Sequence, residues 1–294
     1  MGSKSDFDRF LKAHVERKVL PLRPPRPQPK GGPRSHLVIP DMQLKPWAPI
    51  EHCAWIGAYI AERRPNVVVN LGDMADMASI NSHADPDDLE GRTVLDDLAV
   101  VRDGIALMTR EIRRAKGYKP DLHLTLGNHE GRLYRMVRES PRLRGIYGDD
   151  PFGYAANGWK VHEFLKPVVL DGCAYSHFFP RGANGKITQS FRGAPSAATQ
   201  AKREMRTSIA GHQQGLDVAT VQTGGGRRVW GIIAGSAYIW DEAYLTDQGQ
   251  DHWRGVVMLH DVADGSFDPM FVSMDFLWRR FGNRWKPKPW VPKS

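Results

Sequence analysis

Short apolar runs alternate with longer amphipathic stretches in the first half of the chain. Three runs, HLVIP at 36–40, VVVNL at 67–71 and DLHLTL at 121–126, are each followed by polar residues. Short continuous runs of this kind are typical of strands that are buried on both faces of a parallel sheet. We therefore expect three parallel strands at these positions.

The stretches between these runs have the spacing of helices. Residues 50–63 suit a helix that Pro65 ends, and residues 94–116 suit a long helix that ends at Gly117. A shorter helix is predicted at 131–139. The order strand, helix, strand, helix, strand predicts one right-handed α/β layer.

The second half of the chain changes character. Its apolar segments are short, β-like and separated by Gly and Asp: VVLDGCAYS, SIAG, DVATVQ, VWGIIAGS, GVVML and PMFVSM. Only residues 196–206 have helical spacing. A parallel layer facing a more antiparallel one, with helices outside, predicts an α/β protein built as a two-layer β-sandwich with mixed sheets.

Both ends of the chain differ from this core. Residues 5–19 have helical spacing, and the Pro-rich stretch at 21–34 predicts an extended spacer. Residues 277–294 combine basic and aromatic side chains. The sequence thus predicts an N-terminal helix and spacer at 1–34, a main domain at 35–276 and a C-terminal tail.

Composition indicates the broad class of protein. The 294 residues are 41% hydrophobic and 25% charged, which is ordinary for a globular protein. No apolar run approaches the roughly 20 residues that span a membrane, and the N-terminal residues lack a signal-peptide core. Cys53 and Cys173 lie far apart and predict free thiols in a reducing compartment. We therefore expect a cytoplasmic protein without membrane association.

The formal net charge of +8 is unevenly distributed. Basic residues gather at 1–35, at 131–144 and after Asp275, where Trp and Phe side chains lie between them. Basic groups mixed with aromatic rings can track a phosphate backbone and stack on bases. The same composition also suits a solvated surface whose aromatic residues anchor the tail, so both interpretations stay open.

Polar clusters follow the predicted strands, where ligands gather in α/β sheets. Taken singly these clusters are weak signals, because a Gly-Asp pair is commonly a turn and a lone His is commonly a satisfied polar residue. Their joint order is more informative. The clusters are Asp41-Met42-Gln43, Gly72-Asp73, Gly127-Asn128-His129-Glu130, Tyr175-Ser176-His177 and Gly211-His212-Gln213-Gln214.

This order resembles the calcineurin-like metallophosphoesterase pattern across residues 36–214. Gly-Asn-His-Glu after a strand is its most specific element, and the continuation Gly131-Arg132-Leu133 resembles a branch common among bacteriophage and prophage phosphoesterases. The resemblance implies the calcineurin-like fold for residues 35–276 and a hydrolase with two divalent ions. Such ions clamp the phosphoryl group and lower the pKa of a bound water until its hydroxide can attack. A phage or prophage origin implies the cytoplasm of a bacterial host.

The resemblance also implies a role for each residue. Asp73 bridges both ions. His129 contacts the phosphoryl oxygens or protonates the leaving oxygen without binding metal. Asp76 either orients His129 or caps a helix. Asn128, His177 and His212 complete the site of one ion, and Asp41, Gln43 and Gln214 complete the site of the other.

Gln43 and Gln214 stand where the family pattern has histidines, and both fall on the same ion's site. Three interpretations follow: the amide oxygens bind a hard cation, the site fills weakly and only with substrate, or this ion is lost. Oxygen-rich sites favour Mn²⁺ or Mg²⁺, whereas imidazole suits Zn²⁺ and Fe better. We expect two divalent ions, Mn²⁺ foremost with Mg²⁺, Fe, Zn²⁺ or Ni²⁺ as alternatives, and a weaker Asp41/Gln43/Gln214 site.

Three arginines spaced by three residues share one face of the helix that begins beside His129. This face suits either a solvated surface or a phosphate-binding ridge, and the ridge favours a nucleic acid or nucleotide diester. The ridge residues are Arg132, Arg135 and Arg138, extended by Arg110, Arg113 and Arg114 if these fold nearby. The expected substrate-binding residues are Asn128, Arg132 and Arg135.

The predicted function is divalent-metal-dependent hydrolysis of a phosphodiester in DNA, RNA or a nucleotide, as by a nuclease or phosphodiesterase. A phosphomonoesterase or protein phosphatase on the same fold is an alternative, although the Gly-Asp segment lacks the Asp-Arg-Gly continuation typical of protein Ser/Thr phosphatases. A non-catalytic nucleic-acid-binding or virion-assembly protein with a degenerate metal site is the alternative from another class. The sequence carries no signal for oligomeric state.

Overall fold

The structure, a computed structural model, describes residues 31–82, 84, 86–183, 186–188, 195–242 and 252–288. The chain divides into two compact units, Met1–Gly32 and Pro33–Ser294, and every helix and strand of the described residues belongs to the second. The predicted helix at 5–19 and most of the predicted spacer at 21–34 lie outside the described residues, as do residues 289–294 of the predicted tail.

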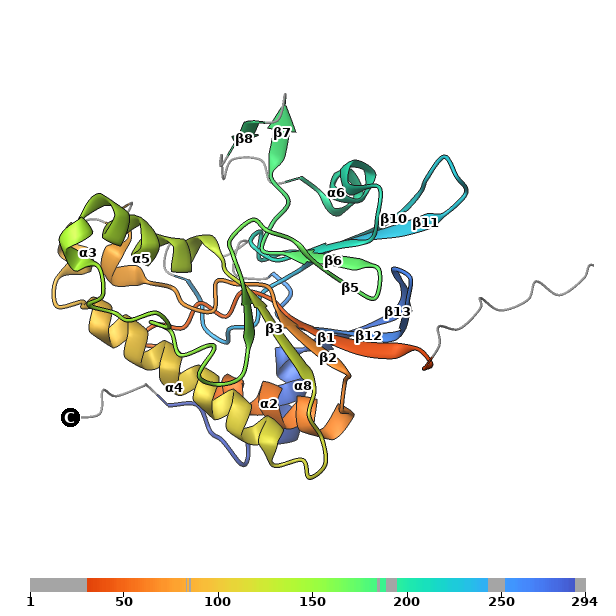
Figure 1. The fold of residues 1–294 in the computed structure, drawn as a ribbon. Helices are drawn as coiled ribbons and strands as arrows, with labels where there is room; N and C mark the ends of the chain where they lie inside the picture. Colours follow the sequence, from red (N-terminus) through yellow and green to blue (C-terminus); the bar gives the residue numbers. More distant parts are fainter. Residues whose placement is uncertain are drawn as a thin grey trace, which may run out of the picture. The chain divides into compact units, whose positions relative to one another are not determined.

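A six-stranded mixed sheet has the strand order β13-β12-β1-β2-β3-β4 (Figure 1). Strands β1 to β4 pair in parallel, while β12 and β13 add antiparallel pairs on the other side of β1. The continuous apolar runs suit the parallel strands because both faces of these strands are covered. The strands are β1 (Arg34–Ile39), β2 (Val67–Asn70), β3 (Asp121–Thr125), β4 (Lys160–His162), β12 (Gly255–Ala263) and β13 (Ser266–Ser273).

A second, five-stranded mixed sheet has the order β10-β11-β9-β6-β5. Its central strand β9 is parallel to both neighbours, whereas β10 and β5 pair antiparallel at the two edges. A separate two-stranded sheet pairs β7 (Arg181–Ala183) with β8 (Lys186–Thr188). The strands of the five-stranded sheet are β5 (Val168–Leu170), β6 (Cys173–Ser176), β9 (Ser208–Ala210), β10 (Leu216–Gln222) and β11 (Arg228–Ala234).

Apolar side chains of both sheets form a common core, to which Val38, Val69, Tyr175, Ile209 and Ile232 contribute. A second core lies between the six-stranded sheet and helices α2, α4 and α8, which cover one face of this sheet (Figure 1). Helix α6 packs on β10 and β11. The helices are α2 (Glu51–Arg63), α3 (Pro86–Leu89), α4 (Val94–Arg113), α5 (Asn128–Glu139), α6 (Ala197–Glu204) and α8 (Met274–Phe281), with 3-10 helices η1 (Ala78–Ile80) and η2 (Pro141–Leu143). Within the described residues, no helix is both long enough and apolar enough to cross a membrane.

The predicted α/β class with two mixed sheets is confirmed. The strands predicted in the first half and the long helices at 50–63 and 94–116 match observed elements to within a few residues. The helix predicted at 131–139 begins earlier, at Asn128, because Glu130 caps its first turn.

Three details of the second half differ from the prediction. The segments 255–259 and 269–274, expected in the second layer, join the first sheet as β12 and β13. Residues 168–176 form a hairpin rather than one strand, because Asp171 and Gly172 take positive φ angles of 47° and 83° and turn the chain. Strand β4 was not predicted, since its three residues carry too short a pattern.

The predicted boundary at 276 falls inside helix α8. Leu277 is fully buried and Phe281 is 6% exposed, because the apolar face of the helix packs against the first sheet and α2. The described part of the predicted tail, residues 277–288, therefore continues the second compact unit.

The fold yields a prediction about acid stability through His52, a fully buried side chain of α2. Burial lowers the pKa of His52 from 6.5 to about 3, so the unfolded chain binds a proton at a pH where the folded protein does not. For this group the free energy of unfolding should fall by about 1.4 kcal/mol for each pH unit as the pH drops from 6.5 to about 3, and should be unaffected above 6.5. Urea unfolding across this range should show a shallower pH dependence in His52→Phe than in the wild type. Equal slopes in the two proteins would contradict the prediction.

Candidate metal centre

The polar clusters meet where strands of both sheets end. Asp41, Asp73 and Asn128 follow β1, β2 and β3 of the first sheet, and His177 and His212 follow β6 and β9 of the second. Parallel neighbours end at the same edge of a sheet, and the two sheets share one core. The topology therefore brings these five side chains to one place.

The backbone of these clusters takes an unusual conformation. Gln43, Asp73, His212 and Gln214 have positive φ angles of 45°, 49°, 69° and 59°. A residue other than glycine adopts this left-handed conformation at a cost of about 1–3 kcal/mol, and such residues concentrate at functional sites. Four of the predicted metal-binding residues thus share a strain that the surrounding packing must offset.

Two glycines allow the clusters to approach each other. A Cβ atom at Gly127 would overlap the carboxylate and backbone nitrogen of Asp73, and one at Gly211 would overlap Oδ1 of Asp41. Any larger residue at either position would displace a carboxylate of the site. The motif glycines are therefore required by the packing around Asp41 and Asp73.

Asp73, Asn128, His177 and His212 form a compact set of donor atoms. Nε2 of His177 lies 2.8 Å from Oδ1 of Asn128 and 3.2 Å from Oδ2 of Asp73. Nδ1 of His212 lies 2.9 Å from the same Asn128 oxygen. Donor atoms of Asp73, His177 and His212 all lie within 4.8 Å of one another, close enough to hold a metal ion.

The hydrogen bonds of His177 fit a cation between these donors. Nδ1 lies 2.8 Å from the Leu71 carbonyl and donates to it, which directs the lone pair of Nε2 toward two oxygens. Electron-rich atoms that face one another need a proton or a metal ion between them. Burial lowers the pKa of His177, but the carboxylates of Asp73 and Asp41 outweigh it and raise the pKa to about 9. The pocket of donors therefore strongly favours a positive charge.

Asp41 and Gln43 supply a second set of donors. Oδ1 of Asp41 accepts a hydrogen bond from the His212 backbone N–H at 2.8 Å, but its buried Oδ2 has no partner among the described residues. Burial raises the pKa of Asp41 to about 7 against the opposing charge of His177. Nε2 of Gln43 is also buried without a partner in the described chain. A cation beside Asp41 would give its Oδ2 a partner. If the Gln43 amide is turned over, so that its oxygen takes the place of Nε2, the same cation would also bind that oxygen.

Gln214 has an aromatic partner. Its Oε1 accepts a hydrogen bond from the Tyr238 hydroxyl at 2.8 Å, and the same hydroxyl lies 3.1 Å from Nε2 of His252. An amide oxygen has two lone pairs, so Gln214 keeps one of them for an ion. This hydrogen bond of the Gln214 side chain runs to Tyr238 and not to Asp41, Gln43 or Asp73, so the role of Gln214 as a metal ligand stays a prediction.

His129 lies beside the donor atoms. Its Nδ1 lies 2.8 Å from the Asp76 carbonyl and 3.1 Å from Oδ1 of the same residue, while its Nε2 lies 3.7 Å from Oδ2 of Asp73. Burial lowers the pKa of His129, but Asp73 and Asp76 outweigh it and the net shift is upward. The structure thus brings His129 and Asp76 together in the arrangement that an orienting role for Asp76 requires.

Only the first residue of the predicted arginine ridge faces the centre. Nη2 of Arg132 lies 3.4 Å from Nε2 of His129, and Nη1 donates to the Asp76 carbonyl at 2.9 Å. The Arg132 side chain is 17% exposed. Arg135 and Arg138 are exposed further along α5. The ridge therefore starts at His129 and continues into solvent.

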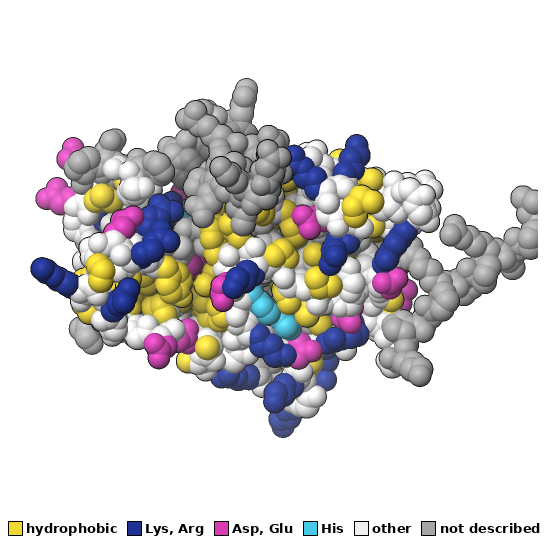
Figure 2. All heavy atoms as spheres, turned by 45° about the horizontal axis from the view of Figure 1, so that its top comes forward, with side chains coloured by type: hydrophobic (Ala, Val, Ile, Leu, Met, Phe, Trp, Pro, Cys, Tyr) yellow, Lys and Arg dark blue, Asp and Glu magenta, His cyan; other side chains and the backbone are white. Residues whose placement is uncertain are grey.

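The second group of arginines does not extend this ridge. Arg110 and Arg113 lie in the last turn of α4 and Arg114 caps it, whereas the first turn is tied to η1 by hydrogen bonds from Ser79 to Asp97. An α-helix of 20 residues spans about 30 Å, so these arginines lie at the far end of α4 from the centre. On the face shown in Figure 2, basic side chains are scattered around a hydrophobic area and do not form one continuous stripe.

Glu130 supports the centre, a role that the sequence analysis did not assign. This carboxylate is fully buried, and burial together with the charge of Asp73 raises its pKa. Glu130 stands three residues after Gly127, which is the position of the acidic residue in a capping box. This spacing is the sequence signal that could have revealed its supporting role. Glu130 accepts hydrogen bonds of 2.9–3.1 Å from the backbone N–H groups of Asp73, Met74, Ala75 and Gly127, and from the Tyr154 hydroxyl.

Lys45 and Glu242 form a buried ion pair close to Asp76. Nζ of Lys45 lies 2.7 and 2.6 Å from the two carboxylate oxygens of Glu242, and 3.9 Å from Oδ2 of Asp76. Lys45 and Glu242 are 6% and 4% exposed. No local sequence signal marks this pair, because its partners lie 197 residues apart.

Comparison with known proteins does not assign the chain to a family. No family model matches the chain, and no curated protein sequence matches it significantly. The functional interpretation therefore depends on the geometry of the centre and on the motifs that produce it.

The hydrogen bonds of Glu130 predict a large loss of stability when its carboxylate is removed. Glu130→Ala leaves four buried N–H groups without an acceptor, and we expect the free energy of unfolding to fall by about 3–5 kcal/mol. Tyr154→Phe removes only one of the five hydrogen bonds and should cost about 1 kcal/mol. Urea unfolding of both variants measures the difference. If Glu130→Ala proves no more destabilising than Tyr154→Phe, the supporting role of Glu130 is wrong.

Proposed function

We propose that this protein is a divalent-metal-dependent phosphoesterase that hydrolyses a phosphodiester in a nucleotide or nucleic acid. The observation that carries the proposal is the convergence of Asp73, Asn128, His177 and His212, with His129 beside them. This arrangement agrees with the resemblance of the motifs to calcineurin-like metallophosphoesterases and with two mixed sheets that share a core.

The donors divide into two chemically different sets. When bound, two divalent ions supply Lewis-acid polarisation of the phosphoryl oxygens and a more acidic water. One set contains two imidazoles, whereas the other offers only carboxylate and amide oxygens, which favour hard ions such as Mn²⁺ or Mg²⁺. The first set is Asp73, Asn128, His177 and His212, and the second is Asp41, Gln43, Asp73 and Gln214.

His129 supplies the proton that the leaving oxygen requires. In the protonated ring, which the upward shift of the His129 pKa favours, Asp76 accepts from Nδ1 and fixes the ring, so the proton on Nε2 is the one available for transfer toward the centre. Arg132 adds positive charge 3.4 Å from Nε2, where it can pair with an oxygen of the phosphate. Asp76 thus acts as a positioning residue, and Arg132 binds substrate.

The surroundings of His129 favour a diester with further phosphates. Arg135 and Arg138 continue the arginine face of α5 into solvent, away from the centre. A small monoester would not reach this face, whereas the backbone of a nucleic acid or an extended nucleotide presents additional phosphates to it.

The proposal predicts phosphodiester hydrolysis that depends on Mn²⁺ and is abolished by chelation. Asp73→Asn should lose metal binding and activity together, because it removes the charge between the two donor sets. His129→Gln should keep metal binding but lose about 10²–10⁴-fold in kcat, since only the proton donor is removed. Asp264→Asn, which alters an exposed carboxylate at the β12–β13 turn, is the matched control and should behave as the wild type.

Four substrates assayed side by side separate the alternatives: single-stranded DNA, duplex DNA, a cyclic nucleotide and an aryl phosphodiester, each compared with an aryl monoester. A strong preference for the monoester would contradict the diesterase proposal. DNA binding with steep salt dependence, without turnover and unchanged in Asp73→Asn, would instead support a non-catalytic binding protein.

The two ion sites should bind metal unequally. Calorimetric titration of metal-free protein with Mn²⁺ should show one tight step and one weaker step, because Gln43 and Gln214 are weaker ligands than imidazole. The double variant Gln43→His, Gln214→His should strengthen Zn²⁺ binding at the weaker step by roughly tenfold or more. Equal and tight Zn²⁺ binding at both sites of the wild type would contradict this asymmetry.

A further inference from the structure

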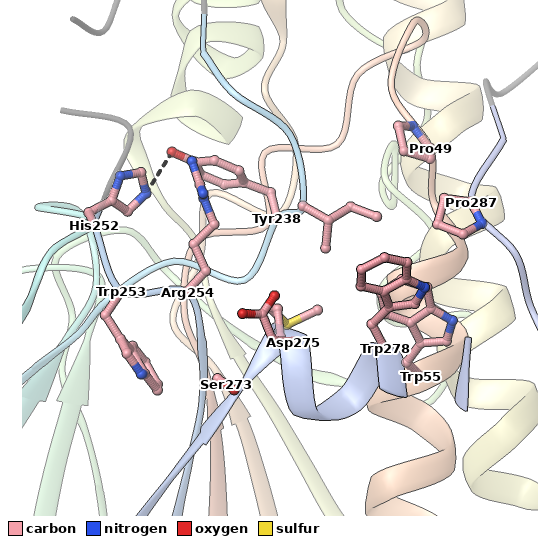
Figure 3. Close-up of a pocket in the computed structure, with 12 residues that line it drawn as sticks. Pro49, Trp55, Tyr238, His252, Trp253, Arg254, Ser273, Asp275, Trp278 and Pro287 are labelled. Carbon is pink, nitrogen blue, oxygen red and sulfur yellow. Dashed lines mark hydrogen bonds between the residues drawn. The ribbon is translucent and has the colours of Figure 1, made fainter. Parts of the chain in front are cut away.

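A cavity of about 600 Å³ lies beside the metal centre, between helices α2 and α8 and the segments that flank β11 and β12 (Figure 3). Pockets for small molecules commonly measure about 300–1,000 Å³ and combine aromatic walls with a few polar groups. The cavity has this composition, with Trp55, Trp278 and Tyr238 among its walls and Arg254, Asp275 and His252 as polar groups.

The aromatic wall is rigid and partly open. Trp278 is 57% exposed, yet Gly282 packs so closely against its indole that a Cβ atom there would overlap the ring. Trp55 also lines the cavity, 1% exposed and held by a hydrogen bond of 2.8 Å from its Nε1 to the Trp285 carbonyl (Figure 3). An indole that is fixed on one side and open on another suits stacking of a planar ring.

A hydrogen-bond donor and an acceptor accompany this wall. The Arg254 guanidinium lies 5.3 Å from the Tyr238 ring and pairs with exposed Asp241 at 3.2 Å, while its Nε has no partner in the described chain. The carboxylate of Asp275 makes no hydrogen bond or ion pair with the described residues. The edge of a nucleobase carries donors and acceptors side by side, and such a pair of side chains can read it.

Positive charge follows the wall toward the end of the chain. Pro287 lines the cavity and stands between Lys286 and Lys288, and Arg279 follows Trp278 on α8. These basic residues flank two lining residues in the sequence, so positive charge lies within a few residues of the cavity. This combination favours a nucleotide over an uncharged aromatic compound.

Tyr238 joins the cavity to the metal centre. Its ring lines the cavity, and its hydroxyl donates to Oε1 of Gln214 at 2.8 Å. One side chain therefore separates the cavity from a predicted metal ligand.

From these contacts we propose that the cavity binds a nucleobase, stacked on Trp278 and read at its edge by Arg254 and Asp275. The inference rests on the proposed function, because it assigns the base-recognition subsite of a nucleotide or nucleic-acid substrate. The base belongs either to a free nucleotide or to a strand of nucleic acid, and the recognition chemistry is the same for both.

The test is calorimetric binding to the full chain in EDTA, where no hydrolysis interferes. The probes are adenosine 5′-monophosphate, ribose 5-phosphate and a single-stranded tetranucleotide. The wild type should bind the mononucleotide or the tetranucleotide and should bind ribose 5-phosphate at least tenfold more weakly. Trp278→Ala should weaken base binding by about tenfold or more, the loss expected for one stacked base.

Phe276→Ala is the matched control, since Phe276 is 42% exposed on the same helix but does not line the cavity. It should leave binding unchanged, whereas Asp275→Asn should weaken binding of adenosine 5′-monophosphate but not of ribose 5-phosphate. Tighter binding of the tetranucleotide than of the mononucleotide identifies a strand as the source of the base, and the reverse identifies a free nucleotide. Equal binding of ribose 5-phosphate and the mononucleotide, no binding of either nucleotide probe, or equal losses in Trp278→Ala and Phe276→Ala would each overturn the proposal.

The outcome is separable from that of the proposed function. Hydrolysis of an aryl phosphodiester with Mn²⁺ needs the metal centre but no base. Trp278-dependent nucleotide binding without any such hydrolysis would support the subsite and contradict the phosphoesterase. Hydrolysis without nucleotide binding would support the phosphoesterase and contradict the subsite.

Discussion

The buried carboxylate of Asp73 is the group on which the rest of the site depends. Its side chain is 2% exposed, and its two oxygens contact the His129 backbone and face the rings of His129 and His177. The Asp73 carbonyl accepts hydrogen bonds from the N–H groups of Met42 and Gln43, so the same residue ties the end of β1 to the end of β2. Burial raises the pKa of Asp73, but the two histidines outweigh it and the net shift is downward. An ionised carboxylate in such a place requires compensating charge.

Close packing holds this carboxylate in place on an unfavourable backbone. Asp73 has a positive φ angle, and Gly127 leaves room for its carboxylate. Glu130 then holds the strained turn by accepting hydrogen bonds from three successive backbone N–H groups, beginning with that of Asp73. This is the expected relation between a functional site and its support, since local strain persists only where neighbouring contacts fix the conformation.

Most of the fold could be predicted from sequence because it follows local patterns, whereas the metal-binding role of each residue came from the resemblance of the motif order to a family; the structure brings Asp73, His177 and His212 of that set within reach of one ion. Continuous apolar runs mark β1, β2 and β3, and the polar residues after them necessarily meet at one edge of the sheet. Sheet membership of β12 and β13 could not be predicted, because a short apolar run carries no information about its partner strand. The Lys45–Glu242 pair and the Tyr238–Gln214 hydrogen bond were missed for the same reason, since each joins residues distant in the chain. The sequence left open whether the arginines at the end of α4 fold near the site, because the distance between the two helices that carry the arginines is set by tertiary packing.

The proposed chemistry requires metal ions around Asp73, so the positions of bound ions test it most directly. A crystal grown with Mn²⁺, measured at the manganese absorption edge, would locate them by anomalous scattering. We expect a strong peak among Asp73, Asn128, His177 and His212, and a second peak, weaker and between Asp73 and Asp41, on the side of Gln43. Absence of any manganese peak within bonding distance of the Asp73 carboxylate at saturating Mn²⁺ would contradict the account.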